Sequence, residues 1–102
     1  MWEEAEKSIA RLSGIHSCRI ILDGADIDQV VVSATINGRD EETRLQNIKS
    51  LVRSITGLLA LEYNLKLDYR KVKILEQDGN GEWVDHSSDR ALRVKILASY
   101  MK

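Results

Sequence analysis

The segment that most constrains this 102-residue chain is residues 39–63, RDEETRLQNIKSLVRSITGLLALEY. Its apolar side chains recur at spacings of three and four, the pattern of one amphipathic helix of about seven turns. Asp40 is a good N-cap and Asn64 a plausible C-terminal stop. Gly57 lowers helix propensity by about 1 kcal/mol relative to alanine, so a bend or an early end there is an alternative. The pattern predicts an α/β domain organised around one helix and carries no information about chemistry.

Alternating apolar and polar side chains predict strands on both sides of this helix. Residues 17–23 and 28–36 are expected to form a β-hairpin with a connection of five or six residues, and residues 72–77 to form a third strand. Residues 2–12 carry apolar side chains at helical spacing, which predicts a short first helix that stops before Gly14.

This order of helix, strand, strand, helix and strand predicts a two-layer α/β sandwich of the α+β type. Both helices are expected on one face of a mostly antiparallel or mixed sheet. Residues 1–77 would form this core. Residues 78–102 are expected to form a C-terminal hairpin and β extension, in which residues 82–84 return as a strand and residues 91–96 form a strand or, alternatively, a helix. This extension is a candidate for the start of a following domain.

The composition, 43% hydrophobic and 30% charged, is that of one soluble globular domain. No apolar run approaches the ~20 residues that cross a bilayer, and the acidic start MWEEAEKS does not predict a secretory signal. A single cysteine fits a reducing compartment, so we expect a cytoplasmic protein with no membrane contact. The net charge of −1 combines −5 over residues 1–42 with +4 over residues 43–102. This asymmetry indicates solvated faces of different charge, with head-to-tail association or an acidic partner as alternatives.

His16 and Cys18 suggest a nucleophile and its base, but their spacing argues against that role. On a strand, residues i and i+2 share a face, and Cys18 falls on the core face with Ile20 and Leu22. We therefore predict a buried, unreactive thiol beside a loop histidine. One cysteine and two histidines also cannot complete a zinc site without carboxylates. The sequence predicts no enzyme activity, no metal and no cofactor.

Residues 78–89, DGNGEWVDHSSD, resemble an EF-hand calcium loop in length and in their first residues. Trp83 occupies the position where that loop needs glycine, and Asp89 replaces the bidentate glutamate. A plain β-turn is therefore the favoured interpretation. No glycine-rich phosphate loop is present, because Gly79 and Gly81 lack the helix start and the lysine that such a loop requires.

A basic cluster follows the long helix: Lys66, Arg70, Lys71 and Lys73, with Tyr69 among them. It is a possible patch for single-stranded RNA, and the α/β layout is similar to that of RNA-binding KH domains. The GxxG clamp of KH domains is missing, however, and the net charge is slightly negative. These two features argue against nucleic acid as a partner.

The back of the predicted sheet carries one large apolar residue on each of three strands, namely Ile21, Val31 and Leu75. A solvated face is normally polar at such positions. Either Trp83 and residues 92–100 fold back over this face, or another protein chain covers it. The candidate interaction surface is therefore Ile21, Val31, Leu75 and Trp83.

Residues 14–77 resemble a small bacterial α/β domain family of unknown function. The resemblance rests on GIHSCRIILDG, DIDQVVVSATING, QNIKSLVRSI and LKLDYRKVKIL. It implies no catalytic residues. It also implies that β-rich sequence follows, so the chain would be the N-terminal domain of a longer bacterial protein.

We therefore predict a non-catalytic protein interaction or oligomerisation module, which binds itself or another protein chain or domain. The alternative is a regulatory domain for a small ligand, with a pocket between the first helix and the sheet. Binding of single-stranded RNA is the third candidate.

Overall fold

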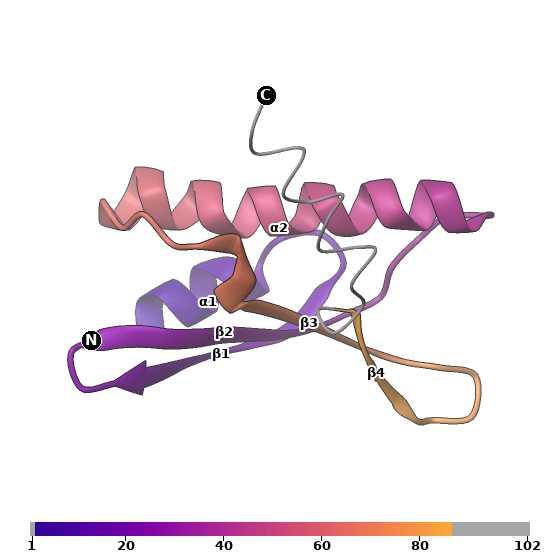
Figure 1. The fold of residues 1–102 in the computed structure, drawn as a ribbon, viewed down its shortest axis with the longest axis horizontal. Coiled ribbons are helices and arrows are strands. Elements are labelled where there is room, and N and C mark those ends of the chain that lie inside the picture. Colours follow the sequence, from indigo (N-terminus) through magenta and orange to yellow (C-terminus); the bar gives the residue numbers. More distant parts are fainter. Residues whose placement is uncertain (1, 87–102) are drawn as a thin grey trace.

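A computed structural model describes residues 2–86 of the chain, and these residues form two helices and one four-stranded open sheet (Figure 1). The elements are α1 (Glu3–Ala10), β1 (Ile15–Asp23), β2 (Asp26–Ala34), α2 (Glu41–Tyr63), the 3₁₀ helix η1 (Tyr69–Lys71), β3 (Val72–Gln77) and β4 (Trp83–Asp85). The predicted α+β class with a mixed sheet is confirmed. The strand expected at residues 91–96 and the cover expected from residues 92–100 lie outside the described residues.

The long helix α2 has the caps that the sequence predicts. The Asp40 carboxylate accepts a hydrogen bond from the Thr43 amide at 2.7 Å, and Asn64 ends the helix in the left-handed conformation with φ 51°. The helix runs through Gly57 without a break, so neither the bend nor the early end occurs. Its inward side chains are Ile48, Val52, Ile55 and Leu59. No helix within residues 2–86 has the length and apolarity to cross a membrane.

The sheet has the order β1-β2-β3-β4, in which β2 and β3 are parallel and the other two pairs are antiparallel. Two neighbouring parallel strands need a crossover, and α2 provides it by running back along the sheet between β2 and β3 (Figure 1). Both helices pack on the same face. They share one core with the inward residues of the strands, in which Ala5, Ile9, Val30, Val32, Ile55 and Leu59 have no exposed surface.

The β1–β2 hairpin is tighter than predicted. Its connection is Gly24-Ala25, two residues rather than five or six, and β2 spans Asp26–Ala34 rather than residues 28–36. Gly24 has φ 63° whereas Ala25 does not have a positive φ. Glycine at the first of two central positions is the pattern of a type II′ turn, which follows the twist of the strands and so closes the hairpin in two residues.

Candidate interaction surface

The open face of the sheet is the face that points away from α1 and α2. Directly opposed residues on neighbouring strands share a face, so the strand register sorts its side chains into rows. Three rows follow from the pairing of the strands: Ile21 with Gln29; Arg19 with Val31 and Lys73; and Ser17 with Ser33, Leu75 and Asp85. A fourth row holds Gln77 and Trp83. Each row lies two residues further along the strands than the one before it.

The four apolar residues predicted from the sequence occur once in each row and once on each strand. Ile21 on β1, Val31 on β2, Leu75 on β3 and Trp83 on β4 therefore form one diagonal line across the open face, which we call the apolar stripe. Trp83 is 57% exposed and Ile21 40%, while Val31 and Leu75 are half-buried. Diagonal neighbours on a sheet lie about 7–8 Å apart, within reach of large side chains.

Polar side chains border the stripe on both sides. Arg19 and Lys73 lie beside Val31 in its row, one on each neighbouring strand. The hydroxyl groups of Ser17 and Ser33 are hydrogen-bonded to each other at 2.6 Å. An apolar centre inside a polar border is the usual arrangement of a protein interface.

The structure changes the expected relation between His16 and Cys18. The β1–β2 register shifts between Ile15 and Ser17, so His16 is the extra residue of a bulge. The His16 ring is hydrogen-bonded to the Thr35 hydroxyl, with 2.6 Å between Nε2 and Oγ1, and both residues are exposed. Cys18 lies inward among the core residues, where burial, with a smaller effect of Glu6, raises the pKa of its thiol to about 12. The assumption that residues 16 and 18 share a face was wrong, because a bulge interrupts the alternation.

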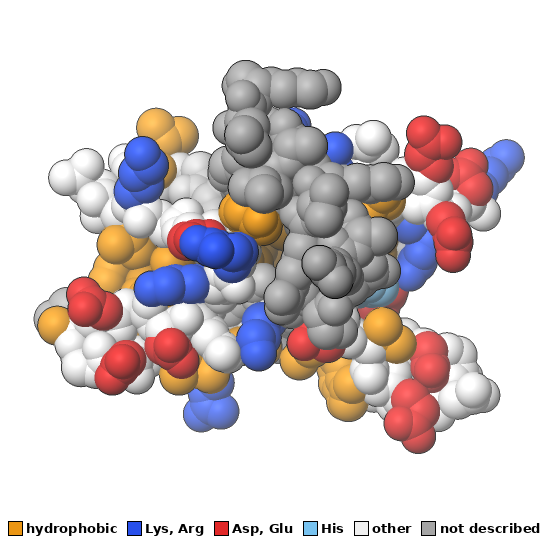
Figure 2. Space-filling model, in the orientation of Figure 1, with side chains coloured by type: hydrophobic (Ala, Val, Ile, Leu, Met, Phe, Trp, Pro, Cys, Tyr) orange, Lys and Arg blue, Asp and Glu red, His pale blue; other side chains and the backbone are white. Residues whose placement is uncertain are grey.

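The four residues of the possible basic patch differ in their surroundings. The Arg70 guanidinium pairs with the Asp68 carboxylate at 2.6 Å, and that hydrogen bond lowers the pKa of Asp68. The Lys71 ammonium donates to the Ile27 carbonyl at 3.0 Å. Lys73 lies on the open face beside the stripe, and Lys66 is exposed before η1. Lys and Arg side chains are interspersed with acidic ones in Figure 2 and do not form one large basic surface in that view.

Sequence reasoning missed Glu76, a polar residue whose carboxylate meets three groups that are distant in the sequence. Its carboxylate accepts hydrogen bonds from the Ile36 amide at 2.7 Å and from the Arg44 guanidinium, and it lies 3.1 Å from the His86 ring. Burial raises the pKa of Glu76, but these three hydrogen bonds outweigh burial and hold the pKa below its ordinary value. A signal existed in the sequence: a charged residue follows Val72 and Ile74 at an inward position of the strand.

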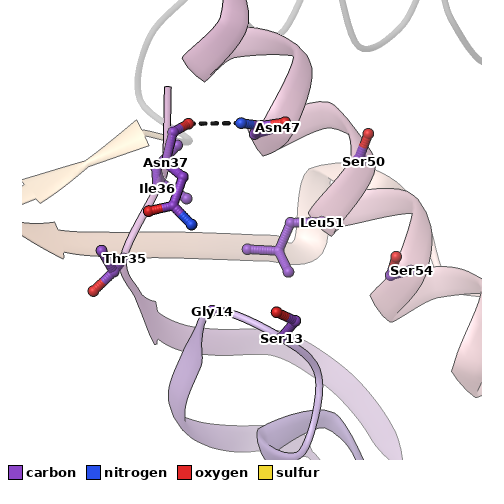
Figure 3. A pocket seen from close by; sticks show the side chains of 9 residues that line it. All are labelled: Ser13, Gly14, Thr35, Ile36, Asn37, Asn47, Ser50, Leu51 and Ser54. Carbon is purple, nitrogen blue, oxygen red and sulfur yellow. Dashed lines mark hydrogen bonds between the residues drawn. The ribbon is translucent and has the colours of Figure 1, made fainter. Parts of the chain in front are cut away.

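A polar hollow of about 270 Å³ lies at one end of the sheet (Figure 3). It is lined by the α1–β1 loop, the segment after β2 and one side of α2: Ser13, Gly14, Thr35, Ile36, Asn37, Asn47, Ser50, Leu51 and Ser54. Leu51 and the Asn37 carboxamide point into it in Figure 3, and Asn47 donates a hydrogen bond to the Asn37 carbonyl at 2.6 Å. This hollow lies beside α2, and the pocket predicted between the first helix and the sheet stays a prediction.

Residues 78–82 form the loop of the β3–β4 hairpin. The Asp78 carboxylate accepts hydrogen bonds from the Asn80 and Glu82 amides, at 2.8 and 2.9 Å, as in a side-chain-capped turn. Within the part of the chain that the structure describes, no three His, Cys, Asp or Glu side chains gather in a metal-binding arrangement.

Comparison of the chain with protein-family models, with curated proteins and with solved structures finds no match. The resemblance over residues 14–77 to a small bacterial family stays a prediction.

Proposed function

We propose that this chain is a non-catalytic protein interaction module and that the apolar stripe on the open face is its binding surface. The observation that carries the proposal is the alignment of Ile21, Val31, Leu75 and Trp83 across all four strands. Apolar residues scattered singly on a surface are ordinary, whereas a continuous apolar line with a polar border is typical of a contact surface.

The β1 edge of the sheet is a poorer candidate than the open face. β1 is an edge strand, and edge strands can pair with another chain through their free amides. Here the Ile20 amide donates a hydrogen bond to the Glu6 carboxylate of α1 at 2.8 Å. An acidic side chain on an edge amide disfavours strand addition, because an incoming strand must displace it. This contact makes the β1 edge a poorer surface for association than the open face.

The size of the stripe supports weak, reversible binding. Complete burial of one Val, Leu or Ile side chain contributes about 1.5–3 kcal/mol, and Val31 and Leu75 are already half-buried. The stripe therefore offers several kcal/mol, which is comparable to the roughly 4–15 kcal/mol that association costs. Hydrogen bonds at the polar border would add to the affinity, so dissociation constants in the micromolar range or above are expected.

The proposal that the module is non-catalytic rests on the side chains of residues 2–86, the part of the chain that the structure describes. His16 pairs with a threonine hydroxyl, and the thiol of Cys18 is half-buried with a raised pKa. Glu76 and His86 are near each other, but the carboxylate is occupied by Ile36 and Arg44. A nucleophile within reach of a free base is the minimum that acyl or phosphoryl transfer through a covalent intermediate requires.

Replacement of Val31 by glutamate tests the surface. Val31→Glu places a charge in the middle of the stripe, and we expect it to abolish association while the chain stays folded. The matched control is Leu61→Glu, which replaces an apolar side chain that is 90% exposed on α2. Sedimentation equilibrium up to about 1 mM, where association of roughly −4 kcal/mol is detectable, measures the mass. Wild type and Leu61→Glu should rise above 11.6 kDa and Val31→Glu should not. Equal masses for the two glutamate variants would contradict the proposal.

A second candidate function is binding of a small ligand, which the polar hollow favours. None of the nine lining residues that belong to the described part of the chain is ionisable. A charged ligand would lose hydration there without gaining a counter-charge, so the chemistry fits a neutral ligand with hydroxyl or amide groups. Neutral sugars and nucleosides should raise the melting temperature of the wild type and leave that of Leu51→Trp, which fills the hollow, unchanged. An equal rise in both proteins, or no rise with any compound, would exclude this function.

A further inference from the structure

We infer that the partner of the open face is a second copy of this chain, related by a two-fold axis that runs along the apolar stripe. This inference rests on the proposed function and specifies its geometry. In a face-to-face dimer of identical chains, the two-fold axis lies in the plane between the two faces. A straight stripe is superposed on a second stripe only if that axis runs along it or at right angles to it.

An axis along the stripe places each stripe residue opposite its own copy. Ile21 then meets Ile21, Val31 meets Val31, and the same holds for Leu75 and Trp83. The apolar line of each chain is covered along its whole length by the apolar line of the other.

The same axis brings the polar border on one side of the stripe opposite the border on the other side. The border residues that come nearest to each other across this axis form three pairs: Arg19 with Gln29, Ser33 with Lys73, and Gln77 with Asp85. Each pair combines one charged side chain with one neutral amide or hydroxyl group. The neutral group can donate a hydrogen bond to a carboxylate or accept one from a cation. No charge of either sign faces its like among these six residues.

An axis at right angles to the stripe gives a less favourable arrangement. This axis would pass through the midpoint of the stripe, between Val31 and Leu75. Lys73 lies beside that midpoint, so it would face Lys73 of the second copy. Ile21 would face Trp83, and Arg19 would face Gln77. Like charges placed opposite each other in an interface oppose association, so the border selects the axis along the stripe.

The diagonal course of the stripe fits the way in which two twisted sheets meet. With strands about 4.8 Å apart and rows about 6.8 Å apart, the stripe makes roughly 35° with the strands. The strands of the two copies would then cross at roughly 70°, close to the orthogonal class of sheet packing. Twisted sheets that cross this steeply approach each other along a line rather than over whole faces. Such a contact therefore requires apolar residues along one line of the sheet and not over its whole face.

Thiol crosslinking at the ends of the stripe tests the axis. Ile21→Cys and Trp83→Cys would be prepared in the full chain, with Trp83→Cys carrying a mass tag. Each variant alone, and a mixture of the two variants, would be treated with a bismaleimide that spans the ~10 Å between packed sheets. The wild type reports any reaction of Cys18, and Leu61→Cys on α2 reports random collision.

We expect Ile21→Cys alone to give about tenfold more covalent dimer than Leu61→Cys, because the axis along the stripe holds its two copies together. Mixed dimers that join Ile21→Cys to Trp83→Cys should stay at the collision level. Predominant mixed dimers would overturn the inferred axis and leave the open face as the binding surface. If the wild type associates but neither the Ile21→Cys dimer nor the mixed dimer exceeds the collision level, the inferred axis is also overturned. The mass of Val31→Glu then tests the proposed function separately. A wild type that is monomeric throughout would overturn both.

Discussion

Glu76 lies at an inward position of β3, where it joins parts of the chain that are far apart in sequence. Its carboxylate binds the Ile36 amide before α2, the Arg44 guanidinium on α2 and the His86 ring after β4. Arg44 in turn donates to the Ile36 carbonyl at 2.7 Å. This network fixes the start of α2 against the end of the sheet from which β4, and with it Trp83, extends.

Replacement of Glu76 by glutamine keeps the shape and removes the charge. Hydrogen bonds to a charged group contribute about 1.5–3 kcal/mol, so we expect Glu76→Gln to lower the free energy of unfolding by that order near neutral pH. The pKa of Glu76 is below 4.5 in the folded chain. Its contribution is therefore present above about pH 4.5 and is lost as the pH falls through the folded pKa.

Urea unfolding of the wild type and Glu76→Gln at several pH values measures this difference. The gap between the two proteins should be widest above about pH 5 and should narrow toward pH 3. A gap that stays constant over this range would show that the carboxylate charge does not stabilise the fold.

Two glycines of different elements test how backbone conformation limits substitution. Gly57 lies inside α2 and Gly81 lies in the β3–β4 loop with φ 79°, and a Cβ atom would meet no other atom within 4 Å at either site. Gly57→Ala should stabilise the fold by about 1 kcal/mol through helix propensity. Gly81→Ala should destabilise it by about 1–2 kcal/mol, because alanine disfavours the left-handed region. Thermal unfolding measures both, and shifts in the same direction would contradict this account.

The elements differ in how far the sequence predicts them. The caps of α2 and the bounds of β3 were predicted correctly, because helix-end signals and strand alternation are local patterns. The start of β2 was predicted too late. Asp28 is an extra residue between Ile27 and Gln29 in the pairing with β1, so the buried residues Ile27 and Val30 are three apart. Alternation cannot detect a strand that continues through a bulge.

At the scale of the whole molecule, the members of the stripe could be predicted but their alignment could not. Alternation assigns Ile21, Val31 and Leu75 to the open face, whereas the diagonal depends on strand order and register, which are set by tertiary pairing. The position of the polar hollow beside α2 was also not predicted, because it too depends on tertiary structure. Its lining comes from residues 13–14, 35–37 and 47–54, which only the fold brings together.

The central claim is that the apolar stripe is a contact surface, and methyl-labelled NMR tests it most directly. Spectra of the full chain with labelled Ile, Leu and Val methyl groups would be recorded from about 10 μM to 1 mM, the range in which weak association is populated. We predict that the methyl signals of Ile21, Val31 and Leu75 shift with concentration while those of Leu61 on α2 do not. Shifts confined to α2, or signals of the stripe that stay constant over the whole range, would contradict the account.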